Sequence, residues 1–150
     1  MTLRLATAKD SDNLFAWRND PVTQACSRST APVARDEHER WMTGNVMLGF
    51  PEHMVLIAES ERGPLGVVRF DGIKGDDLAL AVSITIAPKH RGQGLARGIL
   101  SEACASMSDY TIHAEVRKEN RASRRLFARC GFDEIGRSGD FLSYRREPVT

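Results

Sequence analysis

The stretch Arg91-Gly92-Gln93-Gly94-Leu95-Ala96 decides how this sequence is interpreted. An alternating, strand-like run from Leu78 to Ile86 precedes it, and a segment with helical apolar spacing follows it as far as about Met107. A glycine-rich turn between a strand and a helix leaves backbone N–H groups without partners, and the helix dipole adds partial positive charge there. The stretch therefore predicts a binding site for an anion such as a phosphate group.

Two familiar phosphate-binding turns fit this stretch incompletely. A P-loop needs a lysine directly after its last glycine, and no lysine follows Gly94 or Gly98. A dinucleotide-binding turn can use Gly92 and Gly94, with Glu115 as its later acidic residue, but it puts Arg97 where the helix packs closely on the strand. A dinucleotide-binding module therefore stays as an alternative, which a comparison of NAD with acetyl-CoA binding would separate.

A third pattern fits the order of motifs over residues 78–132. Arg91-x-x-Gly94-x-Ala96 after a strand resembles the coenzyme A loop of the GNAT acetyltransferase superfamily. The run from Glu115 to Asn120 is similar to the end of the family's next strand, and Asn120 to Phe132 resembles its Asn-x-x-Ala/Ser…Gly-Phe helix. The resemblance implies an α+β fold, with a mostly antiparallel mixed sheet of about seven strands flanked by about four helices, and acetyl-CoA as cosubstrate.

Length and composition favour one domain over residues 1–150 and exclude several partners. Charged residues make up 27% of the chain and the formal net charge is +1, so a nucleic-acid partner is not favoured. The three cysteines have no metal-ligand spacing, which predicts no metal site and a reducing compartment. There is no long apolar run, so we expect no membrane span and a cytoplasmic protein.

Residue patterns outside the central stretch predict a sheet with helices on it. Residues 22–33 are rich in Ser, Thr and Ala without a period, and they are interpreted as a loop. Strands are expected over 3–5, 54–60, 65–71, 78–86, 110–116, 132–137 and 140–146, and helices over about 11–18, 35–46, 92–107 and 120–129.

The resemblance implies how acetyl-CoA would be held. The cosubstrate enters between two strands that splay apart, and the backbone of Ile84, Thr85 and Ile86 pairs with its pantetheine arm. Its pyrophosphate lies on the turn formed by Arg91, Gly92, Gln93, Gly94, Leu95, Ala96 and Arg97. Asn120 helps to hold the coenzyme in the family, and a role as the cap of the last helix is compatible with that.

Acetyl transfer to an amine needs a base, because an amine near pH 7 is mostly protonated and cannot attack. Glu115 is at the position where some family members carry a catalytic glutamate, and His113 shares its face of the strand. Either residue is a candidate base, directly or through a water. The alternative for Glu115 is a surface carboxylate paired with Arg117 or Arg124.

The general acid for the leaving thiolate is in doubt. Phe127 stands where the family often has a tyrosine, beside the coenzyme. Tyr144, Ser83 or a water are possible substitutes, and a thiol pKa of about 8.5 makes the thiolate a tolerable leaving group. A coenzyme A-binding module without turnover is therefore a further alternative.

The acceptor amine is left open by two N-terminal motifs. Trp17-Arg18-Asn19-Asp20-Pro21 and His38-Glu39-Arg40-Trp41 resemble a GNAT branch of ribosomal-protein N-terminal and amino-sugar acetyltransferases, including those of pseudaminic acid synthesis. Arg18 and His38 are candidates for the acceptor cleft, and the two tryptophans can instead pack the first helices together. We expect a small-molecule amine, first a nucleotide-linked amino sugar and second a protein N-terminus, and a monomer or homodimer.

Overall fold

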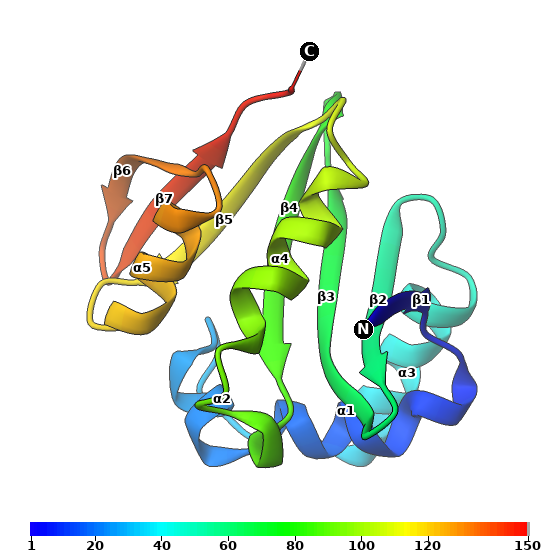
Figure 1. Ribbon diagram of the computed structural model, residues 1–150. Coiled ribbons are helices and arrows are strands. Elements are labelled where there is room, and N and C mark those ends of the chain that lie inside the picture. Colours follow the sequence, from blue (N-terminus) through cyan, green and yellow to red (C-terminus); the bar gives the residue numbers. More distant parts are fainter. Residues whose placement is uncertain (150) are drawn as a thin grey trace.

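A seven-stranded mixed sheet with helices on both faces forms the molecule, of which a computed structural model describes residues 1–149 (Figure 1). The strand order is β1-β2-β3-β4-β5-β7-β6, and every neighbouring pair is antiparallel except β4 and β5. The predicted α+β architecture is confirmed. The strands are β1 (Thr2–Leu5), β2 (His53–Ser60), β3 (Gly63–Ile73), β4 (Asp76–Ile86), β5 (Thr111–Arg117), β6 (Asp133–Ser138) and β7 (Phe141–Arg146).

The described residues form five α-helices, one more than the approximate number expected. The additional helix is α2, which occupies the start of the segment 22–33 that the sequence predicts to be a loop. Asp20 accepts hydrogen bonds from two N–H groups of its first turn, and Pro21 is its first residue, so the helix has a cap and a suitable start despite its lack of an apolar period. The helices are α1 (Ser11–Arg18), α2 (Pro21–Cys26), α3 (Arg35–Trp41), α4 (Leu95–Ala105) and α5 (Arg121–Arg129).

Strand β2 shows how the sheet is covered on two faces. Its side chains alternate: Leu56 and Ala58 belong to the core under α4 and α5, whereas Val55 and Ile57 belong to the core under α1 and the π-helical turn Met42–Met47 that extends α3. Both faces of the central strands are therefore buried, which explains why β2 reads as a continuous apolar run.

The chain between β4 and β5 supplies the one parallel connection. It passes through a short turn of 3₁₀ helix (Pro88–His90), the glycine stretch and α4. The predicted closing hairpin is present as β6 and β7, which turn about Gly139. No helix of residues 1–149 is long and apolar enough to cross a bilayer.

Candidate active site

The candidate site opens where the parallel strands β4 and β5 separate. Their pairing covers only Ala79–Ala81 and Thr111–His113. Beyond these residues β4 continues to Ile86 and β5 to Arg117, and the two strands diverge (Figure 1). Residues 82–86 remain paired with β3 on their other side. Because the N–H and C=O groups of a strand alternate in direction, part of this backbone faces the opening without a strand partner.

A turn rich in free amides lies at the end of β4. Gly92 and Gly94 have φ values of 75° and 73°, a region that glycine adopts without strain. Neither the backbone nor the side chains of residues 1–149 accept a hydrogen bond from the N–H groups of Gly92, Gln93 or Gly94. Gly94 is also the N-cap of α4 and makes no side-chain cap bond there. These free amides and the positive end of an eleven-residue helix together can bind a phosphate group.

The Arg91 side chain, which the resemblance assigns to the coenzyme site, is directed toward α2. Its guanidinium donates to Asp20 at 2.8 Å and to the Thr23 hydroxyl at 2.7 Å. Arg91 lowers the pKa of the Asp20 carboxyl below its ordinary value, against the opposing effect of desolvation. The Arg91 backbone N–H is used as well, since it donates to Pro88. Arg91 therefore anchors α2 to the glycine turn.

Of the two other polar side chains at the turn, one is bonded within the protein and one is free. The Gln93 amide oxygen accepts a hydrogen bond from Arg62 at 2.7 Å, so this side chain ties the turn to the β2–β3 connection. Arg97 is exposed on the first turn of α4, and its guanidinium has no hydrogen bond or ion pair within residues 1–149. Arg97 is the cation of the turn that can still contact an anion.

Glu115 and His113 share the face of β5 that is turned away from α4 and α5. Between them Ala114 is buried in the core beneath those helices. His113 belongs to the last residue pair before the strands part, and Glu115 is two residues into the opening. The Glu115 carboxylate is 49% exposed and forms an ion pair with Arg28. Its partner is thus Arg28, and neither Arg117 nor Arg124 as expected.

Tyr144, a candidate general acid, lies on the opposite face of the sheet from the candidate base Glu115. In the β5–β7 register, Tyr144 is opposite Ala114 and Glu115 is opposite Ser143, so Tyr144 and Glu115 point to different faces. The Tyr144 hydroxyl donates to Glu134 on β6 at 3.4 Å, away from the gap between β4 and β5. The buried Phe127 ring packs on Tyr144, with 6.1 Å between ring centroids.

His38 is part of the helix packing, which corrects its expected place in the acceptor cleft. It is 3% exposed, its Nε2 is 3.0 Å from the Ser11 hydroxyl, and it stacks on Trp41 with a centroid distance of 6.0 Å. The alternative interpretation of the tryptophans is confirmed for Trp17, which is buried in the core under α1. Arg18 donates to the Ser29 carbonyl at 3.1 Å, in the loop after α2.

Asn120 caps α5, as one of its two expected roles requires. Its side-chain oxygen accepts a hydrogen bond from the Ser123 N–H at 3.2 Å. Ile84, Thr85 and Ile86 are half-buried at the far end of β4, next to the glycine turn. Leu95 and Ala96 open α4 and are half-buried as well.

Sequence reasoning missed the loop after α2, which lies across the open end of the gap. Arg117 on β5 donates to the Ser27 carbonyl at 2.9 Å, and Arg28 contacts both Glu115 and the Phe141 ring. The signal that could have found α2 is Asn19-Asp20-Pro21, because an aspartate followed by proline is a typical helix start. The contact between Arg28 and Glu115 joins residues 87 positions apart, and no local pattern indicates it.

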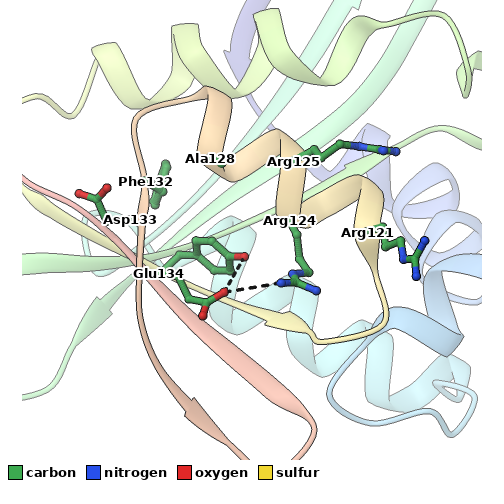
Figure 2. Close-up of a pocket in the computed structure, with 8 residues that line it drawn as sticks. Arg121, Arg124, Arg125, Ala128, Phe132, Asp133 and Glu134 are labelled. Atoms are coloured by element: carbon green, nitrogen blue, oxygen red, sulfur yellow. Dashed lines mark hydrogen bonds and ion pairs between the residues drawn. The ribbon is translucent and has the colours of Figure 1, made fainter.

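A second hollow, of about 540 Å³, lies between α5 and the β6–β7 hairpin (Figure 2). Arg124 and the Tyr144 hydroxyl both approach Glu134 in it, with Arg124 at 3.9 Å. It is lined by Arg121, Arg124, Arg125, Ala128, Phe132, Asp133, Glu134 and Tyr144. Apart from Tyr144 it contains none of the expected site residues, and it is separate from the gap between β4 and β5.

A split sheet with free amides at the start of the crossover helix is the arrangement of an enzyme that takes an acyl group from a coenzyme A thioester. A family model described as the acetyltransferase (GNAT) domain matches residues 1–133. The chain belongs to this family and is an acetyl-CoA-dependent N-acetyltransferase that acts on amines.

The proteins that this chain resembles differ in the amine that their names specify. The L-methionine sulfoximine/L-methionine sulfone acetyltransferase of Salmonella typhimurium is 27% identical over 139 residues, which are 88% of this chain and 80% of that protein. A crystal structure of a putative phosphinothricin N-acetyltransferase is 25% identical with a TM-score of 0.84, covering 99% of both chains. The spermidine N-acetyltransferase of Vibrio cholerae in complex with CoA and spermine has the same fold, with 21% identity, a TM-score of 0.81 and coverage of 96% and 92%.

Proposed function

We propose that this enzyme transfers the acetyl group of acetyl-CoA to a small primary amine in the gap between β4 and β5, with Glu115 as the general base. The observation that carries the proposal is the separation of the two strands after Ala81 and His113. It leaves one edge of β4 free next to three free amides of the glycine turn. An elongated ligand with a diphosphate at one end fits both features.

The pantetheine arm of acetyl-CoA would lie along residues 84–86 as an additional strand, because its amides can bond the free edge of β4. The pyrophosphate would accept hydrogen bonds from Gly92, Gln93 and Gly94, and the exposed Arg97 would add charge. This placement directs the thioester toward the narrow end of the gap, where the two strands part and His113 and Glu115 lie on β5.

The chemistry requires one proton to leave the acceptor before attack. Glu115 takes a proton from the ammonium group, and the nitrogen lone pair then forms a C–N bond with the thioester carbon. The C–S bond breaks with its electrons on sulfur, and the second amine proton is lost as the amide forms and the thiolate is protonated from water. Tyr144 is not needed for this step, because a thiolate leaves without a strong acid.

Acetyl transfer from labelled acetyl-CoA tests the proposal. The acceptor panel contains α-amino acids, spermidine, a nucleotide-linked amino sugar and a peptide with a free N-terminus. Glu115→Gln should lower kcat by about a hundredfold with little change in the KM for acetyl-CoA, because it removes only the base. Release of free thiol in the presence of the amine gives the same rate by an independent readout.

The matched control is Glu119→Gln, which neutralises an exposed glutamate close to Glu115 whose carboxylate forms no ion pair within residues 1–149. It should leave kcat unchanged. Full activity of Glu115→Gln together with loss of activity in His113→Asn would assign the base to His113. Failure of the wild-type enzyme to acetylate every amine in the panel would refute the proposed reaction.

A further inference from the structure

The ion pair between Arg28 and Glu115 joins the loop after α2 to the strand that carries the proposed base. Both side chains are open to solvent, at 67% and 49% exposure. An exposed pair of this kind contributes little free energy, so its partners can be exchanged for others at low cost. The proposed base of the reaction is thus held by a cation that is itself accessible to a ligand.

A second arginine lies beside Arg28 and has no acidic partner. The guanidinium carbons of Arg28 and Arg117 are 4.5 Å and 4.8 Å from the centroid of the Phe141 ring. Arg117 is fixed by the backbone carbonyls of Ser27 and Arg28, at 2.9 Å and 3.4 Å. Arg117 has no ion pair within residues 1–149, so its charge is balanced only by carbonyl dipoles and an aromatic ring.

The three charged residues linked through Arg28 therefore carry one excess positive charge. Arg28 and Arg117 contribute two positive charges and Glu115 one negative charge, whereas the nearby Arg91 is neutralised by Asp20 and Arg145 by Glu147. An acceptor that carries only ammonium groups would meet net repulsion here. An acceptor with an anionic group beside its amine would match both signs of charge.

We infer that Arg28 selects acceptors that carry a carboxylate next to the reacting amine, that is, amino acids rather than polyamines. This inference rests on the proposed function and names the substrate class of that same site. The acceptor carboxylate replaces Glu115 as the partner of Arg28, with Arg117 as a second cation, and the acceptor ammonium group becomes the partner of Glu115. The exchange releases Glu115 from its arginine at the moment when an amine proton is next to it.

A buried donor without a partner is also present next to this loop. Nη1 of Arg18 is buried and has no hydrogen-bond partner within residues 1–149, while Nη2 of the same guanidinium holds the Ser29 carbonyl, one residue after Arg28. A buried donor without a partner costs free energy, so a rearrangement of this loop that gives Nη1 an acceptor would be favourable.

The test compares three acceptors that differ only in the group next to the amine. They are L-methionine sulfone, its carboxamide, and 3-(methylsulfonyl)propylamine, which lacks the carboxylate. Arg28→Ala should lower kcat/KM for the carboxylate acceptor by about tenfold to a hundredfold, the usual range for a lost hydrogen bond to a charged group. Arg28→Ala also removes the partner of Glu115 for every acceptor, so the result that counts is the difference between acceptors: the loss for the carboxamide and the amine should be at least about fivefold smaller than that for the carboxylate acceptor, since neither has a carboxylate to pair with Arg28.

For each acceptor, the kcat/KM of the variant is divided by that of the wild type. This ratio removes the effect of the different basicities of the three amines. Arg28→Lys should give an intermediate loss, because it keeps the charge without the planar fork of the guanidinium. Arg40→Ala is the matched control, since Arg40 is a 72% exposed arginine on α3 that pairs only with Asp36 among the described acidic residues. It should change none of the three ratios.

Equal losses for all three acceptors in Arg28→Ala would overturn the inference, because they would indicate a structural role. Calorimetric titration of the three compounds into the CoA-loaded protein separates recognition from catalysis. Tighter binding of the carboxylate compound that disappears in Arg28→Ala supports the inference even where no acetyl transfer occurs, an outcome that would refute only the proposed reaction. Equal binding of all three compounds by the wild-type protein would overturn it.

Discussion

Asp10 is a buried carboxylate whose negative charge is maintained by three short hydrogen bonds. Arg4 donates to both of its oxygens at 2.9 Å, and the Thr7 N–H donates at 2.8 Å. Burial alone would raise the pKa of this carboxyl. The hydrogen bonds from Arg4 and Thr7 outweigh burial, so the pKa of Asp10 is lowered from its ordinary value.

We predict that Asp10→Asn lowers the free energy of unfolding at pH 7 by about 2 kcal/mol, the range for hydrogen bonds between charged groups. A carboxyl with a lowered folded-state pKa stabilises the fold above its unfolded-state pKa, and this contribution is lost as pH falls through the folded-state pKa. The difference between wild type and variant should therefore shrink below about pH 4.

Urea unfolding at pH 7 and pH 3 measures this difference. Asp12→Asn is the control, because the Asp12 side chain is 93% exposed and its contact with Arg35 is long, at 3.4 Å. It should have almost no effect at either pH. A gap between wild type and Asp10→Asn that stays constant with pH would show that the charge of Asp10 is not the stabilising feature.

Single residues were predicted from the sequence where the role is local. Asn120 was expected as a possible helix cap, and it is one, because capping depends on residues three positions apart. The surroundings of Tyr144 and His38 could not be predicted, because the face of a strand and the depth of a helix depend on register and packing between distant segments. Arg28 could not be found, since it lies in a loop and its partner Glu115 is 87 positions away on β5.

At the scale of the element, the start of α4 has a strict backbone requirement. Gly94 is the N-cap at a φ of 73°, and an added Cβ would meet no atom within 4 Å, so the requirement is conformational and not one of space. We predict that Gly94→Ala weakens binding of acetyl-CoA by about tenfold, because a residue with a Cβ disfavours this φ by about 1 kcal/mol or more and the free amides change direction.

Gly98→Ala is the matched control for this prediction. Gly98 lies inside α4, its added Cβ also meets no atom within 4 Å, and its φ is not positive. This variant should stabilise the helix by up to about 1 kcal/mol and leave acetyl-CoA affinity unchanged. Titration calorimetry with both variants decides the matter, and unchanged affinity in Gly94→Ala would remove the turn from the proposed phosphate site.

Helices and strands with a strong apolar pattern were predicted from the sequence, and α2, which has none, was missed. Strand β2 and helix α4 carry strong apolar patterns, because each is buried against a large core, and both occur where the sequence indicates. Helix α2 has six residues and no buried side chain, so its sequence has no apolar period. It is held by its cap and by Arg91, a contact between residues far apart in the chain.

At the scale of the whole molecule, the unpaired part of β4 gives a testable response to the cosubstrate. Amides of residues 82–86 that face the gap should exchange more slowly with deuterium when acetyl-CoA is bound, because the pantetheine arm supplies their missing partners. Amides in the fully paired part of β3 should not change and serve as the internal reference. No added protection of β4 would contradict the proposed position of the cosubstrate.

Helix α2 and its following loop connect the two halves of the divided sheet. Arg91 links the helix to the half that ends with β4, and Arg117 links the loop to the half that begins with β5. Between those halves the strands share only three residue pairs. We therefore expect this segment to limit how far the two strands can separate, so a ligand that widens the gap would also displace Arg28 and with it Glu115, the residues proposed to contact the amine.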